Sequence, residues 1–241
     1  MPRLDALLAL NLGCSKTKAR DVLADGRVRG ADGAPLEDPR LDVPAASLPF
    51  AVTVDDESLA LVAVAHVLQH KPTGCVTALD DARHPTAYAL LGDAPLHAEL
   101  RPVGRLDLDT SGLLLWTTEG TWLQRLTHPK HAVPRTYHAA LARPFRAPPP
   151  AGLTLDDGHR PTITTLEPLA RDDAHPALRA PDEAVLFATL TIVGGAYHEV
   201  RRIFAALDSH VLALCRVSFG RLALPRDLSS GEWRTIVPAD V

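Results

Sequence analysis

The sequence predicts a two-domain α+β protein, with a small N-terminal domain followed by a larger domain of strands and helices. Leucines at helical spacing open the chain, and a short alternating segment follows them. Later apolar runs have the length and the β-branched content of strands, with helical patterns between them. The 241 residues, 46% of them hydrophobic, are enough for one medium domain and a small one.

The first 45 residues are expected to form two short helices and a hairpin. Ser15 is placed to cap the second helix, and Gly26 is placed to end it. Residues 27–29 then alternate as a short strand, and Asp32-Gly33 is a strong signal for a tight turn.

This N-terminal segment carries a local excess of positive charge in a chain whose formal net charge is −4. An acidic chain is a poor non-specific nucleic-acid binder, because such binding comes mainly from neutralising phosphates. A basic patch could still bind RNA, and the alternative is a solvated helix face without a ligand. The candidate RNA-binding residues are Lys16, Lys18, Arg20, Arg27 and Arg29.

A change in composition predicts the domain boundary. Residues 44–50 are rich in Pro, Ala and Ser, and the apolar run 59–68 follows. We therefore expect the first domain at 1–45, a linker at 46–58 and the second domain at 59–241.

The second domain is expected to alternate strands, helices and two polar or proline-rich loops at 144–150 and 171–181. The expected elements are a core strand at 113–117, a helix at 121–126 stopped by His128-Pro129, strands at 135–141 and 185–193, and a helix over 200–207.

The segment 104–115 sets charged residues directly against an apolar run. Arg105, Asp107 and Asp109 alternate with leucines, and in an extended strand this spacing sends all three charges to one face. Burying a carboxylate costs several kcal/mol unless a cation or hydrogen bonds compensate, so such a group marks chemistry or a fixed ion pair. The alternative is a solvated surface strand closed by an ordinary turn at 109–112.

These residues resemble the active-site motif of the pseudouridine synthases that modify bacterial ribosomal RNA. The motif is Gly-Arg-Leu-Asp followed by Thr-x-Gly-Leu, here at 104–107 and 110–113. In the third motif of the family Gln is usual where this chain has Glu199. The other segments that resemble family motifs are His70–Gly74, Asp80–Thr86, Gly195–Ala206 and Leu228–Arg234.

The resemblance also implies the fold and the reaction. Residues 1–45 are similar to an RNA-binding domain of a ribosomal small-subunit protein. The catalytic domain is expected to have a mostly antiparallel mixed sheet flanked by helices, with the active site in a cleft across it. Isomerising uridine breaks a bond from the sugar to nitrogen and rejoins the same sugar carbon to a ring carbon, so we expect no metal and no cofactor.

Four residues receive roles by resemblance. Asp107 matches the nucleophile, attacking either the anomeric sugar carbon or carbon 6 of uracil, and Arg201 matches the cation paired with it. Tyr137 matches the tyrosine that stacks on the target base and could take a proton. Arg105 matches the arginine that holds the flipped-out nucleotide, with a structural salt bridge to Asp109 as the alternative.

The expected function is isomerisation of one uridine in 16S ribosomal RNA, because the loop 80–86 and the lack of a basic C-terminal tail look like the small-subunit (Rsu) type. The alternatives are a 23S ribosomal RNA enzyme of the same family and a catalytically inactive assembly factor that binds ribosomal RNA. A glycoside hydrolase using Asp107 and Asp109 is a further alternative, but no aromatic sugar platform of the kind such enzymes use accompanies these two residues.

The expected partner is ribosomal RNA or an assembling ribosomal subunit, bound by a monomer. No apolar run approaches the roughly 18 to 20 residues of a membrane span, and the N-terminus lacks a secretory signal, so we expect a cytoplasmic protein without membrane contact. Three scattered cysteines argue against disulfides and against a structural zinc site.

Overall fold

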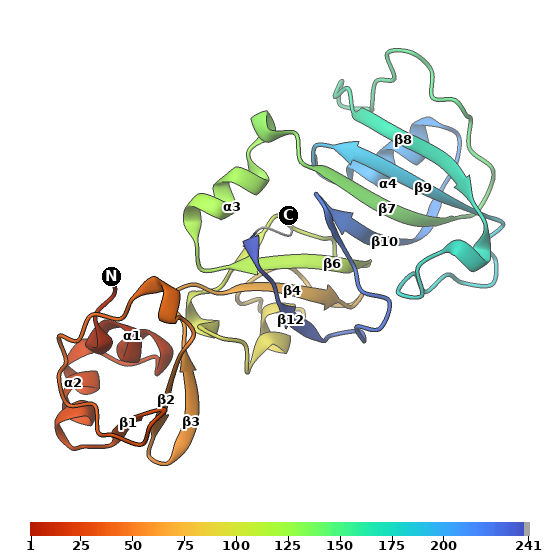
Figure 1. Ribbon diagram of the computed structural model, residues 1–241. Coiled ribbons are helices and arrows are strands. Elements are labelled where there is room, and N and C mark those ends of the chain that lie inside the picture. The colour runs from red at the N-terminus through yellow and green to blue at the C-terminus, as the bar shows by residue number, and fades with distance from the viewer. Residues whose placement is uncertain (239–241) are drawn as a thin grey trace. The chain divides into compact units, whose positions relative to one another are not determined.

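The computed structural model describes residues 1–238, which divide into two compact units (Figure 1). The first unit consists of Met1–Ala65 and Asp93–Leu100. The second unit consists of His66–Gly92 and the described residues from Arg101 onward. Each unit is described by itself.

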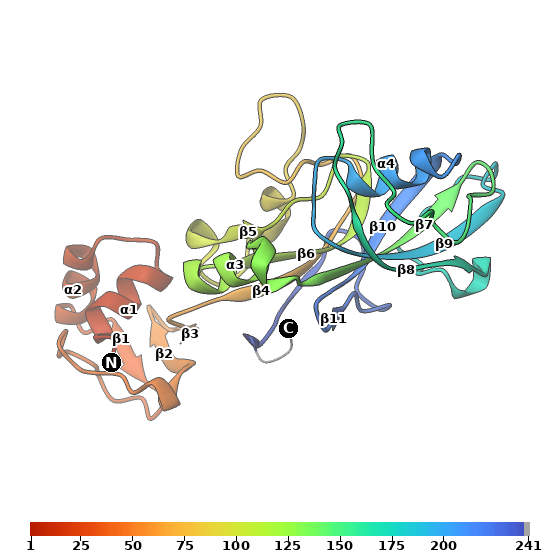
Figure 2. The same cartoon turned by 90° about the horizontal axis from the view of Figure 1, so that it is seen from above.

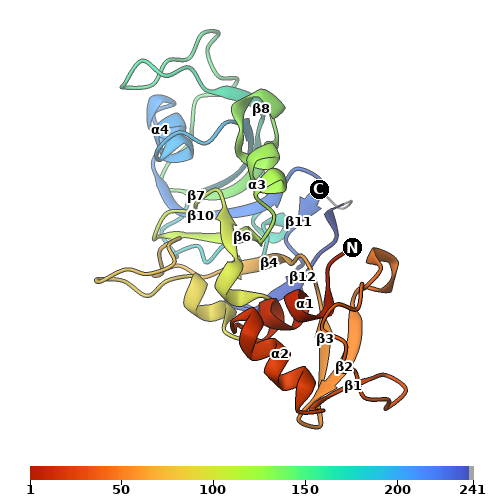
Figure 3. The same cartoon turned by 90° about the vertical axis from the view of Figure 1, so that its left-hand side faces the viewer.

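The first unit packs two helices on one face of a small antiparallel sheet (Figure 3). As expected, the Ser15 hydroxyl caps the second helix, accepting a hydrogen bond of 3.2 Å from the backbone N–H of Lys18. Leucines of the first helix are fully buried against valines of the sheet, which form the core of the unit. The elements are α1 (Leu4–Asn11), α2 (Lys16–Ala24), β1 (Val28–Gly30), β2 (Phe50–Val54) and β3 (Glu57–Leu61).

The segment expected as a linker, 46–58, folds into this first unit. β2 pairs with β1, and β3 pairs with β2. Val52 and Leu61 are buried in the same core as the helices. The apolar run 59–68 is therefore divided, since its first residues belong to β3 and its last to β4 (His66–Lys71) of the other unit. Composition alone missed this boundary because both pieces are equally apolar.

The second unit is built on one mixed sheet, which within residues 66–238 has nine strands in the order β12-β4-β6-β10-β7-β9-β8, with β5 beside β6 and β11 beside β10. All pairs are antiparallel except β6 with β10, which confirms the expected mostly antiparallel mixed sheet. The strands besides β4 are β5 (Arg101–Val103), β6 (Thr110–Thr117), β7 (Pro134–Leu141), β8 (Thr162–Leu169), β9 (Leu186–Val193), β10 (Val211–Phe219), β11 (Leu222–Ala223) and β12 (Trp233–Thr235).

Two helices accompany this sheet in the described part of the unit, α3 (Gly120–Thr127) and α4 (Glu199–Ala206). α4 lies on one face of the sheet, where it contacts β10 and buries Ile203 and Phe204 (Figure 2). Both helices and the strands β6, β7 and β9 lie where the sequence predicts them.

Single turns of 3-10 helix occur in both units, at η1 (Ala45–Ser47) and η3 (His97–Glu99) of the first and at η2 (Tyr88–Leu91), η4 (Pro129–His131) and η5 (Arg171–Asp173) of the second.

The parallel pairing of β6 with β10 requires glycine at position 112. Thr110–Gly112 lies opposite Leu214–Arg216, and a Cβ on Gly112 would meet the carbonyl oxygen of Arg216 at 2.3 Å. The φ angle of Gly112 is +112°, which side chains rarely adopt. This close approach brings the start of β6 directly beside β10.

No helix within residues 1–238 has both the length and the apolar character that crossing a membrane would require.

Candidate active site

Asp107 lies in the connection between β5 and β6, which is a loop and not the extended strand expected at 105–109. The Thr77 hydroxyl donates to the carbonyl of Leu106 at 3.0 Å and accepts from the N–H of the same residue at 3.1 Å. The N–H of Thr110 closes a turn on the carbonyl of Asp107 at 3.1 Å. These groups bond within the loop and to Thr77, so this backbone does not pair with a neighbouring strand.

The ammonium group of Lys71 lies under this loop and is fully buried. It donates hydrogen bonds to the carbonyls of Pro72 at 2.9 Å, Asp107 at 3.0 Å and Thr110 at 2.9 Å. Burial lowers the pKa of Lys71, and the nearby acidic groups, including Asp107, oppose that shift. Lys71 therefore fixes the backbone of Asp107, a role that its place in the turn His70–Gly74 did not reveal.

The carboxylate of Asp107 is about a third exposed, and its Oδ1 lies 3.5 Å from Nε2 of His198. Arg201 was expected to pair with Asp107, but its Nη2 lies 2.8 Å from Oδ2 of Asp109. The other terminal nitrogen of Arg201 donates to the carbonyl of Val211 at 3.1 Å. Asp109 pairs with Arg201, and the alternative salt bridge from Arg105 to Asp109 is not among the ion pairs of the described residues. Arg201 thus holds the loop two residues beyond the expected nucleophile.

The four residues with expected roles line one cavity of about 950 Å³ within the second unit. Asp107 and Arg105 enter from the β5–β6 loop, Tyr137 from β7 and Arg201 from α4. Tyr137 is buried in the wall, whereas Arg105 is exposed. The volume is near the upper end of the usual range for small-ligand sites. The structure therefore brings together residues that are almost 100 positions apart in the chain.

Two further arginines, Arg135 and Arg216, make this cavity strongly basic. Arg216 is 1% exposed, donates to the carbonyl of Leu113 at 2.8 Å and lies over the ring of Phe219, 5.2 Å from its centroid. Arg135 lies over the same ring at 4.8 Å, and burial lowers its pKa. Four arginines thus face two carboxylates, those of Asp107 and Glu199, an arrangement that favours an anionic ligand. The sequence feature that could have identified Arg216 is the presence of an arginine inside an otherwise apolar strand.

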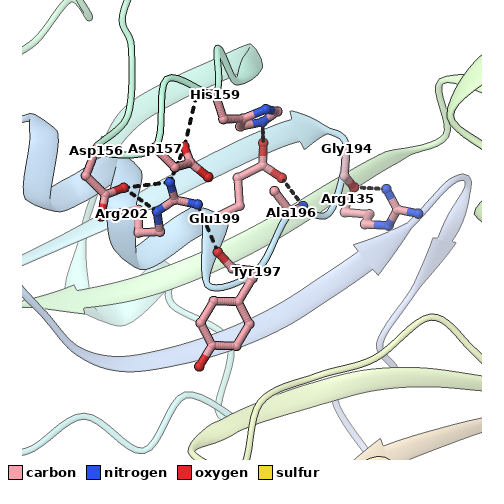
Figure 4. A network of polar contacts seen from close by, with 9 residues as sticks. All are labelled: Arg135, Asp156, Asp157, His159, Gly194, Ala196, Tyr197, Glu199 and Arg202. Atoms are coloured by element: carbon pink, nitrogen blue, oxygen red, sulfur yellow. Dashed lines mark hydrogen bonds and ion pairs between the residues drawn. The ribbon is translucent and has the colours of Figure 1, made fainter.

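The loop before α4 forms one wall of the cavity, and Glu199 organises it (Figure 4). The buried Glu199 carboxylate accepts from the N–H of Ala196 at 2.9 Å and lies 2.8 Å from Nε2 of His159. Its negative charge, which is unusual at this position in the motif, is therefore compensated inside the protein.

Arg202 belongs to the same network, although the cavity does not include it. Its guanidinium pairs with Asp156 at 2.6 Å and with Asp157, which ties α4 to the loop before β8 (Figure 4). Arg135 donates to the carbonyl of Gly194 on the opposite side. The two successive arginines thus have different positions, since Arg201 lines the cavity and Arg202 does not.

The five candidate RNA-binding residues of the first unit are exposed, but three of them have partners within the protein. Arg20 pairs with the buried Asp5 at 2.8 Å, Arg27 with Asp55 at 2.6 Å, and Arg29 donates to the carbonyl of Gly33. Burial acts to raise the pKa of Asp5, but the hydrogen bond from Arg20 and the charges of Arg3 and Arg20 outweigh it and hold that pKa below its ordinary value. Within the described chain, the side chains of Lys16 and Lys18 have no partner.

Within residues 1–238, no group of three or more His, Cys, Asp or Glu side chains is placed to hold a metal ion.

Comparison with known proteins identifies the family of the chain. The family model described as RNA pseudouridylate synthase matches residues 65–206, a range that includes Asp107, Tyr137 and Arg201. Ribosomal small subunit pseudouridine synthase A of Haemophilus influenzae is 33% identical over 245 residues, covering 99% of this chain and 97% of the relative. The protein of the same name from Escherichia coli K12 is 33% identical over 248 residues, covering 99% and 98%.

A solved structure agrees as well. The crystal structure of a pseudouridylate synthase superposes with a TM-score of 0.61 at 31% sequence identity, covering 100% of this chain and 98% of that chain. The family model covers more than half of the chain, and the relatives align with it over almost its full length. This chain belongs to the RNA pseudouridylate synthase family and is an RNA pseudouridine synthase.

Proposed function

We propose that the protein converts one uridine of 16S ribosomal RNA to pseudouridine, with Asp107 as the nucleophile. The observation that carries the proposal is the position of Asp107, held by its backbone at the wall of a basic cavity that also contains Tyr137 and Arg201. The full-length similarity to proteins named ribosomal small subunit pseudouridine synthase A supports the choice of substrate.

The reaction breaks the bond from the anomeric sugar carbon to N1 of uracil and forms a bond from the same carbon to C5. The proton on C5 is lost, and N1 gains one, so no outside group is needed. Asp107 forms a transient covalent bond, either with the sugar carbon or with C6 of the ring. The buried Tyr137 stacks on the base and holds it while it turns.

The basic residues around Asp107 divide the remaining tasks. Lys71 and Arg201 are positioning residues, because each binds the loop of Asp107 without pairing with its carboxylate. Arg105 is exposed at the cavity, where its guanidinium can hold a phosphate of the extruded nucleotide. Such backbone contacts offset the cost of removing a base from its stack.

The test of the nucleophile is Asp107→Asn with 16S ribosomal RNA transcribed in vitro and labelled with tritium at C5 of uridine. Release of tritium should be abolished while affinity for the RNA stays nearly unchanged, since the substitution removes one charge and little volume. Asp172→Asn makes the same change at an exposed acid outside the cavity and should keep wild-type turnover. Turnover by Asp107→Asn close to that of the wild type would refute the assignment.

Mapping the product separates the substrate alternatives. Carbodiimide treatment of 16S and 23S ribosomal RNA, followed by reverse transcription with and without the gene, should show one stop in 16S that depends on this protein. A stop in 23S instead would favour the other branch of the family, and no stop in either would favour an inactive assembly factor.

We further propose that the first unit contributes to RNA binding through Lys16 and Lys18, the exposed lysines without partners. The double variant Lys16→Glu/Lys18→Glu should weaken affinity and lower the slope of log affinity against log salt by about 1 for each lost phosphate contact. Glu37→Gln, on the surface of the same unit, serves as a control. An unchanged slope would remove these lysines from the interface.

A further inference from the structure

Tyr197 is a large aromatic side chain exposed at the active-site cavity. It is 76% exposed, and both it and the adjacent His198 line the cavity. A single exposed apolar residue needs no explanation. The way in which this ring is held does need one.

The ring of Tyr197 stacks on the ring of His198, with centroids 3.9 Å apart and an angle of 16° between the planes. His198 has φ 49° and ψ 31°, in the left-handed region that residues other than glycine seldom adopt, and it immediately precedes α4. The pair is therefore set in a defined backbone conformation and not on a freely varying loop.

Hydrogen bonds fix the backbone on both sides of the pair. Arg202 donates to the carbonyl of Tyr197 at 3.2 Å while it pairs with two aspartates. Glu199 binds the N–H of Ala196. Figure 4 shows the Tyr197 ring projecting away from this network of polar contacts. The exposed aromatic ring is thus preorganised, so less conformational entropy is lost when a ligand binds to it.

The stacked pair also reaches the expected nucleophile. Nε2 of His198 lies 3.5 Å from Oδ1 of Asp107, so the Tyr197 ring stacks on the residue that contacts Asp107. Arg105 lines the same cavity, and its exposed guanidinium favours the phosphates of a nucleic acid. A flat ring beside basic groups is the combination on which unpaired nucleotides stack.

We infer that Tyr197, backed by His198, is a stacking platform for the base of a nucleotide adjacent to the target uridine. The inference rests on the proposed function. When the uridine leaves its stack, its neighbour loses a stacking partner, and the Tyr197 ring replaces that partner at the mouth of the cavity. The platform lowers the cost of extruding the uridine and tolerates any base, because every base presents a π face.

The test compares Tyr197→Ala, Tyr197→Leu and Tyr197→Phe with the 16S transcript. Affinity is measured in the Asp107→Asn background, where turnover cannot interfere, and KM and kcat are measured in the active background. Tyr197→Ala and Tyr197→Leu should weaken affinity and raise KM about tenfold or more, with a smaller change in kcat. Tyr197→Phe keeps the ring and should recover most of that loss.

Two controls separate stacking from a structural effect. Val185→Ala shortens another exposed apolar side chain, outside the cavity, and should bind and react as the wild type does. The midpoint of thermal unfolding of each Tyr197 variant should match that of the wild type, because the ring is largely exposed.

Wild-type affinity and KM in Tyr197→Ala would overturn the platform, and so would equal values for Tyr197→Leu and Tyr197→Phe, which would indicate a plain apolar contact. If the wild type forms no pseudouridine while Tyr197→Ala still binds RNA more weakly, the proposed function fails and the platform stands. If the wild type is active and Tyr197→Ala is indistinguishable from it, the platform alone fails.

Discussion

Replacing Lys71 by methionine should destabilise the second unit and lower turnover, although the side chain is hidden from any substrate. The ammonium is fully buried and donates to three carbonyls, two of which belong to Asp107 and Thr110 at either end of a turn. Methionine has a similar length and fills the space, so the change removes the hydrogen bonds without leaving a large cavity.

The size of the effect follows from those three hydrogen bonds. A hydrogen bond to a charged group contributes about 1.5–3 kcal/mol net, and the cost of burying the ammonium offsets part of the total. Removing the ammonium leaves neutral carbonyls without a donor, and a buried acceptor left unsatisfied costs about 1–3 kcal/mol, so we expect a loss of about 1–3 kcal/mol in the free energy of unfolding. A displacement of about 1 Å at a reacting group lowers the rate by about 10²-fold, so kcat should fall strongly as well.

Urea unfolding followed by tryptophan fluorescence measures the first effect, since all three tryptophans lie in the second unit. Tritium release from labelled 16S ribosomal RNA measures the second. Lys130→Met, at an exposed lysine of the same unit, should leave the free energy of unfolding unchanged. If Lys71→Met matches the wild type in both stability and kcat, Lys71 does not hold the loop of Asp107.

Two further substitutions test the framework of the second unit. Gly112→Ala should lower the free energy of unfolding by more than about 4 kcal/mol and abolish soluble expression, because its Cβ would meet the Arg216 carbonyl at 2.3 Å. Gly120→Ala, whose Cβ would meet nothing within 4 Å, should be tolerated. Soluble yield and the urea midpoint of each variant measure both effects. Burial lowers the pKa of His138 and of His175 below the ordinary 6.5, so their neutral forms stabilise the fold above that pH and the contribution is lost as pH falls. His138→Asn, which can still accept the hydrogen bond from the N–H of His175, should flatten the decline of the unfolding midpoint between about pH 7 and 5, and an unchanged decline would contradict this reading.

Local patterns predicted the elements that are marked by an apolar run or by residues that stop a helix. β6 is buried at every position and ends in a sharp change of composition, and α3 is stopped by His128-Pro129, so both were visible in the sequence. The segment 46–58 was not, because β2 pairs with β1, about 20 residues earlier, and β3 in turn pairs with β2. Such pairing leaves little trace in composition.

The same limit applies to the site. Resemblance to a motif selected Arg105, Asp107, Tyr137 and Arg201, and the structure places all four at one cavity. It did not predict that Arg201 would pair with Asp109, because an ion pair depends on atoms brought together by tertiary structure. For the same reason, the contribution of Lys71 became apparent only from the carbonyls around its ammonium group.

The parallel contact between β6 and β10 has a mechanical consequence. Within the described strands, only three ladder pairs join the β12-β4-β6 half of the sheet to the β10-β7-β9-β8 half, and the side chain of Arg216 adds a hydrogen bond to the carbonyl of Leu113. Asp107 belongs to the first half and Tyr137 to the second. The spacing between the Asp107 carboxylate and the Tyr137 ring therefore depends on this short ladder and on the core packed across it, and a nucleotide that contacts both residues would link the two halves of the sheet.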